Sequence, residues 1–289
     1  MPGTLFVVAT PIGNLEDITA RALRVLGEVA LIAAEDTRHT ARLLARYAIS
    51  TPTTSFHQHN ESAKAAALLE RLHRGQDVAL VSDAGTPTVS DPGRRLVRAA
   101  LEAGVRVEPI PGPNAAVAAI SATGLGDGTF TFLGFPPVRS KDRKEWFDRA
   151  ARCGGTVVFY EAPHRISKTI EEVRLRFKTS AIGMCREMTK LHESIAVYSD
   201  ASIADAALEP RGEYTVVVDI GQTTNNIENG ASGIAQTDHD VFTLFCYMTE
   251  HGSLGRREAV KAVADKFGLS TKQAYSAIQR ELDSAKRPT

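Results

Sequence analysis

The chain has 289 residues and carries no net charge, with 34 lysines and arginines balancing 34 aspartates and glutamates. Its 43% hydrophobic and 24% charged residues are ordinary for a globular protein that buries a core. The balanced charge argues against a non-specific nucleic-acid binder, which is usually basic. No apolar run approaches the roughly 18 residues that span a bilayer, and no signal-peptide pattern opens the chain. We therefore expect a cytoplasmic protein.

The cysteines and histidines do not form a recognisable metal or disulfide pattern. Cys153, Cys185 and Cys246 are far apart and include no Cys-x-x-Cys pair. His57 and His59 lie close together but have no carboxylate or cysteine partner at ligand spacing. We therefore predict reduced thiols and no bound metal.

The first part of the chain, residues 1–124, alternates apolar runs with helical patterns. Runs typical of buried strands lie at 5–9, 29–34, 78–82 and 105–110. We expect Asp17, Asp91 and Asn114 to be helix N-caps, because short polar side chains bond the free amides of a first turn. Strands that alternate with helices predict a lobe with a mostly parallel sheet.

Strand patterns dominate after the glycine-rich stretch at 124–128. They lie at 129–133, 156–160, 181–185, 195–198 and 214–220, with one clear helix near 167–177. Residues 125–221 are therefore predicted to form a second α/β lobe with a mixed sheet. Residues 222–239, rich in Gly, Asn, Thr and Ser, are predicted to be a flexible linker. Residues 240–289 are expected to form a small helical, helix-turn-helix-like domain with a capping box from Ser270 to Gln273.

Three polar segments rich in glycine or proline follow strands of the first lobe, at 10–14, 82–87 and 111–114. Ligands of open α/β sheets bind beyond the carboxyl ends of the strands, and small residues let them approach the backbone. One such segment is typical of a tight turn, but three at equivalent positions favour a binding cleft. The sequence contains neither Gly-x-Gly-x-x-Gly nor a P-loop, which argues against a dinucleotide or nucleotide triphosphate site.

Several short motifs occur together in one order. They are Ala-Thr-Pro-Ile-Gly-Asn (9–14), Glu-Asp-Thr-Arg (35–38), Ser-Asp-Ala-Gly-Thr-Pro (82–87), Ser-Asp-Pro-Gly (90–93), Pro-Gly-Pro (111–113), Gly-Phe-Pro (134–136), Phe-Tyr-Glu (159–161) and Arg-Glu-Met-Thr-Lys (186–190). Each motif is weak alone, but the ordered set is specific. Over about residues 5–221 the chain resembles the ribosomal RNA small subunit methyltransferase I family of the tetrapyrrole-methylase superfamily.

This resemblance implies a two-lobed α/β fold that holds S-adenosylmethionine between the lobes. It implies methyl transfer to the ribose 2′-hydroxyl of a cytidine in the decoding region of 16S rRNA, by a homodimer that acts on the assembled small ribosomal subunit. Two alternatives stay open. One is a tetrapyrrole (precorrin-type) methyltransferase of the same fold, against which the helical tail and the Glu-Asp-Thr-Arg segment argue. The other is a non-enzymatic helix-turn-helix regulator, which rests on the tail alone.

The resemblance also implies a set of cofactor contacts from both lobes. They are Pro11, Asp83, Ala84, Gly85, Thr86, Pro87, Asn114 and Ala115 from the first lobe, and Tyr160, Met184, Gly212 and Glu213 from the second. Asn114 is equally a helix cap, and the two roles are compatible. Tyr160 and Met184 fit the core of buried strands as well as they fit a cofactor site.

A ribose hydroxyl is a poor nucleophile while it is protonated, so a general base is expected. We predict Glu187 as this base, with Lys190 orienting the hydroxyl or lowering its pKa. A surface charge cluster is the alternative reading of both residues. Glu35, Asp36 and Arg38 form a second candidate cluster.

Basic residues in three places are candidates for contact with RNA. They are Arg38, then Arg139, Lys141, Arg143 and Lys144 beside Trp146, and finally Arg256 and Arg257 in the tail. Arginine binds phosphate well, and an aromatic ring beside basic residues can stack on a base. A solvated loop and a packing or dimerising tail are the alternatives.

Overall fold

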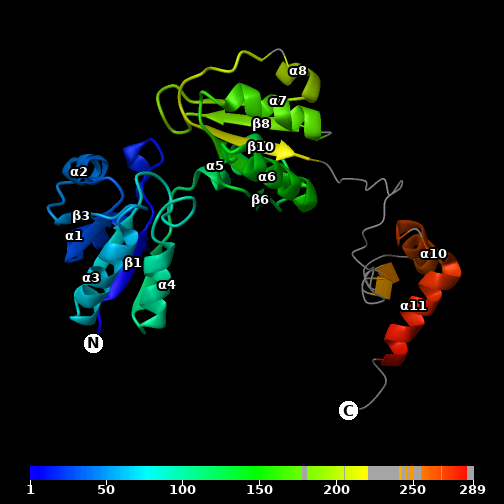
Figure 1. Ribbon diagram of the computed structural model, residues 1–289, viewed down its shortest axis with the longest axis horizontal. Coiled ribbons are helices and arrows are strands. Elements are labelled where there is room, and N and C mark those ends of the chain that lie inside the picture. Colours follow the sequence, from blue (N-terminus) through cyan, green and yellow to red (C-terminus); the bar gives the residue numbers. More distant parts are fainter. Residues whose placement is uncertain are drawn as a thin grey trace. The chain divides into compact units, whose positions relative to one another are not determined.

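The computed structural model describes residues 1–177, 181–204, 206–220, 241–242, 245, 248–249, 255–267 and 269–284. Contacts between residues divide the chain into two units, Met1–Thr224 and Asn225–Thr289. The first unit contains two lobes, coloured blue to cyan and green to yellow in Figure 1. The linker predicted at 222–239 lies outside the described residues. In the described part of the chain, no helix is long and apolar enough to cross a membrane.

The sheet of the first lobe is parallel, as predicted. Its order is β3-β2-β4-β1-β5, and every described pairing within it is parallel. The strands are β1 (Thr4–Val8), β2 (Leu31–Ala34), β3 (Thr53–Ser55), β4 (Val78–Val81) and β5 (Arg106–Ile110). Strand β3 was not predicted, because its three residues Thr-Thr-Ser are too short and too polar to give an apolar run.

Helices cover both faces of this sheet. They are α1 (Ala20–Glu28), α2 (Thr37–Arg46), α3 (Glu61–His73) and α4 (Arg94–Glu102), and a 3₁₀ helix η1 (Leu15–Asp17) precedes α1. Leu26 of α1 and Leu44 of α2 pack on one face, whereas Leu72 of α3 and Leu96 of α4 pack on the other. Alternate residues of each strand point to opposite faces of the sheet, so the same strands contribute side chains to the apolar core on both faces.

The second lobe has a mixed sheet, as predicted. Its order is β6-β7-β10-β8-β9, with β6 parallel to β7 and the other pairs antiparallel. The strands are β6 (Thr131–Phe132), β7 (Thr156–Glu161), β8 (Ala181–Arg186), β9 (Ser194–Tyr198) and β10 (Tyr214–Asp219). Phe147 of α6 (Ser140–Cys153) and Ile170 of α7 (Ile166–Arg176) pack on one face, near α8 (Asp200–Ala204). Helix α5 (Ala115–Thr123) packs on the other face.

The predicted helix caps are partly correct. Asn114 caps α5 by accepting hydrogen bonds from two amides of its first turn, at 3.0 and 3.1 Å. Asp17 is not a cap, because it belongs to η1 and Thr19 caps α1 instead. Asp91 is also not a cap, because Gly93, with φ of 119°, precedes α4. The Asp91 carboxyl is thereby left for another role.

The second unit contains α10 (Arg256–Phe267) and α11 (Thr271–Ser284), which share a core around Val263, Ala274 and Ile278. The predicted capping box is confirmed. The Ser270 amide donates to Gln273 Oε1 at 2.9 Å, and the Gln273 amide donates to Ser270 Oγ at 3.2 Å. These reciprocal bonds satisfy two amides at the start of α11.

Candidate active site

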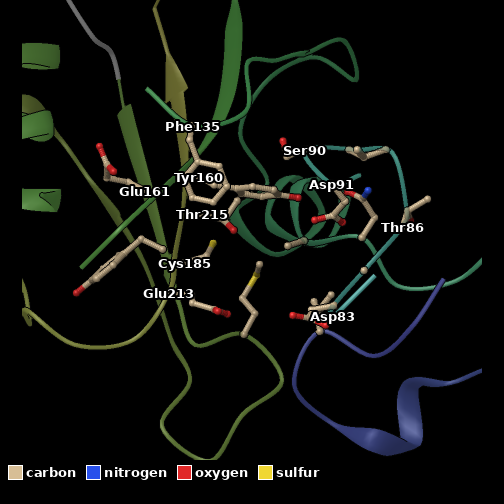
Figure 2. A pocket seen from close by; sticks show the side chains of 18 of the residues that line it. Asp83, Thr86, Ser90, Asp91, Phe135, Tyr160, Glu161, Cys185, Glu213 and Thr215 are labelled. Carbon is tan, nitrogen blue, oxygen red and sulfur yellow. The ribbon is translucent and has the colours of Figure 1, made fainter. Parts of the chain in front are cut away.

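Loops at the carboxyl ends of the first sheet and one face of the second sheet enclose a cavity of about 400 Å³, here called the inter-lobe cavity (Figure 2). This volume is typical of a site for a small molecule or cofactor. The cavity is lined by Ile12, Glu35, residues 83–86, residues 89–91, Asn114, Ala115, Phe135, residues 160–163, Cys185, Met188, Lys190 and residues 213–215.

The three loops that were predicted to line a cleft are bonded to one another. Thr10 and Gly85 exchange backbone hydrogen bonds of 2.9 and 3.0 Å. The Thr10 hydroxyl donates to the Ser82 carbonyl at 3.1 Å, and the Thr86 hydroxyl donates to the Pro113 carbonyl at 3.1 Å. Gly85 has φ of 79°, a conformation that favours glycine. The cavity wall on this side is therefore fixed by the loops themselves.

Three carboxyl groups of the first lobe, from Glu35, Asp83 and Asp91, line the inter-lobe cavity. Burial raises the pKa of Asp91 to about 7, and the nearby Glu35 and Asp83 charges act in the same direction. Burial, together with the Asp83 charge, also raises the pKa of Glu35. Asp83 accepts a hydrogen bond from the Asp36 amide at 2.9 Å. Carboxyl groups so close together favour either a bound cation or a shared proton.

Aromatic rings of the second lobe face these carboxyl groups. The Tyr160 ring lies 4.8 Å from the Phe132 ring and 5.4 Å from the Phe135 ring, measured between centroids. In Figure 2 the Tyr160 hydroxyl points toward Asp91, with Phe135 beside Tyr160. Phe135 lines the cavity and is 53% exposed, so its ring is accessible to a ligand. The inter-lobe cavity thus has the carboxyl groups of the first lobe opposite a second-lobe wall that includes the Tyr160 and Phe135 rings.

Lys190 is held by two carboxylates. Its Nζ lies 2.9 Å from Glu187 Oε1 and 2.9 Å from Glu213 Oε2. The Glu213 amide also donates to Glu187 Oε1 at 2.8 Å. Burial alone would lower the pKa of Lys190, but its hydrogen bonds to Glu213 and Glu187 raise it above its usual value. Lys190 therefore remains a cation at neutral pH.

Glu187, which was predicted to be the general base, contacts Lys190 and does not line the cavity. Glu187 lines neither of the two cavities of the site, and its Oε1 already accepts two hydrogen bonds. Burial would raise the pKa of Glu187, but the Lys190 and Glu213 hydrogen bonds bring it below its usual value. Glu187 and Thr189 have φ of 50° and 65°, strained values for residues with side chains.

A second cavity of about 400 Å³ adjoins the first and is here called the α2 cavity. The two share Ile12, Asp83, Ala84, Lys190 and Glu213. The remaining lining residues are Thr10, Pro11, Gly13, Leu15, His39, Thr40, Arg42, Leu43 and Ser82. Lys190 thus stands at the boundary between two cavities of similar size.

The predicted cofactor residues fall mostly around this boundary. Asp83, Ala84, Gly85, Thr86, Asn114, Ala115, Tyr160 and Glu213 line the inter-lobe cavity, and Pro11 lines the α2 cavity. Pro87 and Gly212 line neither. Gly212 instead packs against Glu187, since a Cβ added there would lie 2.5 Å from the Glu187 Cγ.

Met184 does not face the cofactor region as predicted. Its side chain is buried with the α6 and α7 core, on the other face of β8. Its neighbour Cys185 lines the cavity instead, because successive strand residues point to opposite faces. Burial raises the pKa of the Cys185 thiol to about 11, so it is a protonated wall residue and not a nucleophile.

Two of the residues proposed for RNA contact are part of the protein interior. Arg143 is only 11% exposed, and its Nε lies 2.8 Å from Glu172 Oε2. The Trp146 ring is buried and its Nε1 donates to the Leu133 carbonyl at 3.0 Å. Neither is free to contact RNA. The exposed candidates are Arg38, Arg139, Lys141, Lys144, Arg256 and Arg257.

Several lining residues were missed from the sequence. Asp91 was interpreted as a helix cap, and Phe135 and Thr215 were not singled out as lining residues. Cys185 and Thr215 lie on strands next to or near the strand of Tyr160, and alternate residues of a strand face opposite sides of the sheet. This alternation was the available sequence signal, but it does not say which side faces a cavity when both sides are apolar. Among the described residues, no group of three His, Cys, Asp or Glu side chains is arranged to hold a metal ion.

Comparisons with known proteins agree with this architecture. Residues 4–204 match the family model described as Tetrapyrrole (Corrin/Porphyrin) Methylases. A protein of Xylella fastidiosa named Ribosomal RNA small subunit methyltransferase I is 44% identical over 283 residues, which cover 95% of this chain and 98% of the relative. A protein of the same name from Halalkalibacterium halodurans is 38% identical over 284 residues, 96% of each chain.

A solved structure of diphthine synthase is similar to this chain with a TM-score of 0.60, over 75% of this chain and 90% of that one. The two sequences are only 15% identical, so this likeness concerns the fold alone.

Proposed function

Since the chain belongs to the ribosomal RNA small subunit methyltransferase I family, within the tetrapyrrole methylases, we propose that it methylates the ribose 2′-hydroxyl of a cytidine in the decoding region of 16S rRNA. We propose S-adenosylmethionine as the methyl donor. The observation that supports this most directly is the inter-lobe cavity, in which three carboxyl groups face aromatic rings.

The residues of the inter-lobe cavity fit this cofactor. Glu35, Asp83 and Asp91 complement its positive sulfonium and ammonium groups, and the rings of Tyr160 and Phe135 suit its adenine. The cofactor can approach the backbone closely at Ala84, Gly85 and Ala115, because these residues have small side chains or none. When bound, S-adenosylmethionine supplies an electrophilic methyl group for the acceptor oxygen.

The role of the chain is then to hold the acceptor hydroxyl in line and to accept its proton. Correct placement alone contributes about 7–11 kcal/mol to such reactions. Lys190, a cation at the boundary of both cavities, is suited to orient the hydroxyl and lower its pKa. Glu187 positions Lys190 and is poorly suited to accept the proton itself, because its Oε1 already accepts two hydrogen bonds and its pKa is lowered. Asp83, whose carboxyl group lines both cavities, is better placed to receive the proton.

We further propose a cytoplasmic homodimer that acts on the assembled small ribosomal subunit. The exposed basic residues Arg38, Arg139, Lys141, Lys144, Arg256 and Arg257 supply charge for the RNA backbone. The even balance of total charge fits recognition of one folded particle better than non-specific binding.

The test is transfer of labelled methyl from S-adenosylmethionine to unmethylated small subunits. The label is expected in an alkali-resistant dinucleotide, since a methylated 2′-oxygen cannot take part in alkaline cleavage. Asp83→Ala is expected to abolish transfer, whereas Asp127→Ala, which changes an exposed residue that lines neither cavity, leaves it unchanged. Absence of label on subunits and on naked 16S rRNA would overturn the proposed substrate, and porphyrinogen turnover would then support the tetrapyrrole alternative.

A further inference from the structure

Helix α2 carries three arginines in one row. Arg38, Arg42 and Arg46 are spaced four residues apart, so they lie on the same face of the helix. Thr40, Leu43 and Leu44 are the buried residues of α2 and occupy its opposite face. All three arginines are exposed, and each lies about 6 Å along the helix axis from the next. The row therefore presents a line of positive charge away from the core.

Arg42 differs from its neighbours in this row. The Arg38 guanidinium binds the Asp36 carboxylate, with Nε 3.1 Å from Oδ1. The Arg46 guanidinium lies over the Tyr47 ring, 5.4 Å from its centroid. Within the part of the chain that the structure describes, no carboxylate pairs with Arg42, and no hydrogen-bond partner holds its side chain. Arg42 is also the member of the row that lines the α2 cavity.

The two adjoining cavities differ in the charged side chains that line them. The inter-lobe cavity carries the carboxyl groups of Glu35 and Asp91, which the α2 cavity lacks. The α2 cavity carries Arg42 and His39, which the inter-lobe cavity lacks. Lys190 is common to both. The inter-lobe cavity is therefore the more acidic of the two. The α2 cavity keeps the shared Asp83 and Glu213 but adds the cation Arg42 to Lys190, which gives an anionic group two cations to bind.

We propose that the α2 cavity receives the acceptor nucleotide and that Arg42 binds the phosphodiester beside its ribose. This inference rests on the proposed function and deepens it, because methyl transfer requires donor and acceptor to be bound at once and to meet. The boundary at Lys190 is the place where two such ligands meet. Arg46, whose guanidinium lies over a ring and is not paired with a carboxylate, then extends the contact along the RNA backbone.

The test compares Arg42→Ala with Arg98→Ala. Arg98 is another exposed arginine, on α4, which packs on the other face of the sheet, and it lines neither cavity. Binding to the RNA of small ribosomal subunits is measured against potassium chloride concentration, and binding of S-adenosylmethionine is measured by calorimetry. Transfer to small subunits is followed for the wild type and for both variants.

We expect Arg42→Ala to weaken RNA binding about 5- to 10-fold at low salt and to reduce the slope of log K against log salt by about 0.7–0.9, as for one lost phosphate contact. Its affinity for S-adenosylmethionine and its melting temperature stay at the wild-type values, and Arg42→Lys restores most of the slope. RNA binding and transfer by Arg42→Ala equal to those of Arg98→Ala would overturn the inference and leave the proposed function intact. Absence of transfer and RNA binding in the wild type would overturn both.

Discussion

Gly13 of the first lobe lies directly against Lys190 of the second. A Cβ placed on Gly13 would lie 2.5 Å from the Lys190 Cγ, 2.6 Å from the Thr189 Oγ1 and 2.9 Å from the Met188 carbonyl oxygen. The adjacent Asn14 amide donates a hydrogen bond of 2.9 Å to the same Thr189 oxygen. The loop after β1 therefore fixes the position of Lys190 by close backbone approach, and glycine is required for that approach.

Gly13→Ala is expected to displace the 187–190 segment and lower methyl transfer by at least 10-fold, because a shift of about 1 Å at a positioning group costs roughly that much or more. Gly27→Ala is the matched control, since a Cβ at Gly27 in α1 would meet nothing within 4 Å. That control should retain full activity and gain about 0.5–1 kcal/mol of stability from helix propensity. Steady-state transfer rates and urea unfolding of both variants check the prediction. Equal activity of the two variants would contradict it.

Asp91 is expected to make the stability of the protein depend on pH. Its pKa of about 7 lies above the ordinary value of 3.8, so between these values the folded state holds a proton that the unfolded state has lost. The free energy of unfolding then falls as the pH rises from about 4 to 7 and levels off above that. Asp91→Asn removes the ionisable group, so the variant does not lose this part of its free energy of unfolding as the pH rises. After allowance for partial exposure, we expect the variant to be about 1–2 kcal/mol more stable than the wild type at pH 8.

Urea unfolding at pH 5 and pH 8 measures this difference. The Asp91→Asn variant should show a smaller fall between the two values than the wild type shows. Parallel curves for the two proteins would mean that the Asp91 carboxyl titrates at its ordinary pKa.

Phe135 is expected to contribute to cofactor affinity. Its ring is exposed at the inter-lobe cavity and contacts Tyr160 edge to face. Stacking of a base on an aromatic side chain is worth about 1–3 kcal/mol, so Phe135→Ala should weaken S-adenosylmethionine binding about 5-fold or more. Phe130→Ala, which removes another exposed ring that lines neither cavity, should leave the affinity unchanged. Unchanged cofactor affinity with weaker RNA binding would instead place the acceptor base on Phe135.

The sequence predicted the parts of the fold that local patterns determine. The buried strands of the first lobe and the capping residues Asn114 and Ser270 follow from apolar runs and from side chains that bond nearby amides. Met184 was expected at the site because the resemblance implied it, and the alternative of a core position is the one the structure has. The direction in which a strand faces is a tertiary property that local patterns do not determine. Arg143 looked like a free basic residue because its partner Glu172 is 29 positions away in the sequence.

The core of the second lobe contains an ion-pair network beside the site. The fully buried Glu161 carboxylate lies 3.1 Å from the Arg165 Nε and accepts a hydrogen bond of 2.5 Å from the Thr169 hydroxyl. Arg165 also donates to the Pro136 carbonyl, next to Phe135. The network thereby connects the buried Glu161 carboxylate, through Arg165, to the loop that carries the exposed Phe135 ring of the inter-lobe cavity.

Arg165→Ala is expected to destabilise the protein by about 3–5 kcal/mol, because it leaves the Glu161 carboxylate buried without its closest counter-charge. Arg98→Ala breaks a pair that is 79% and 66% exposed, and it should change the free energy of unfolding by less than about 1 kcal/mol. Urea unfolding measures both changes. The double variant Arg165→Ala with Glu161→Gln should recover part of the lost stability, since it removes the unpaired charge. If the double variant is as unstable as Arg165→Ala, the loss comes from the freed Pro136 loop and not from the buried carboxylate.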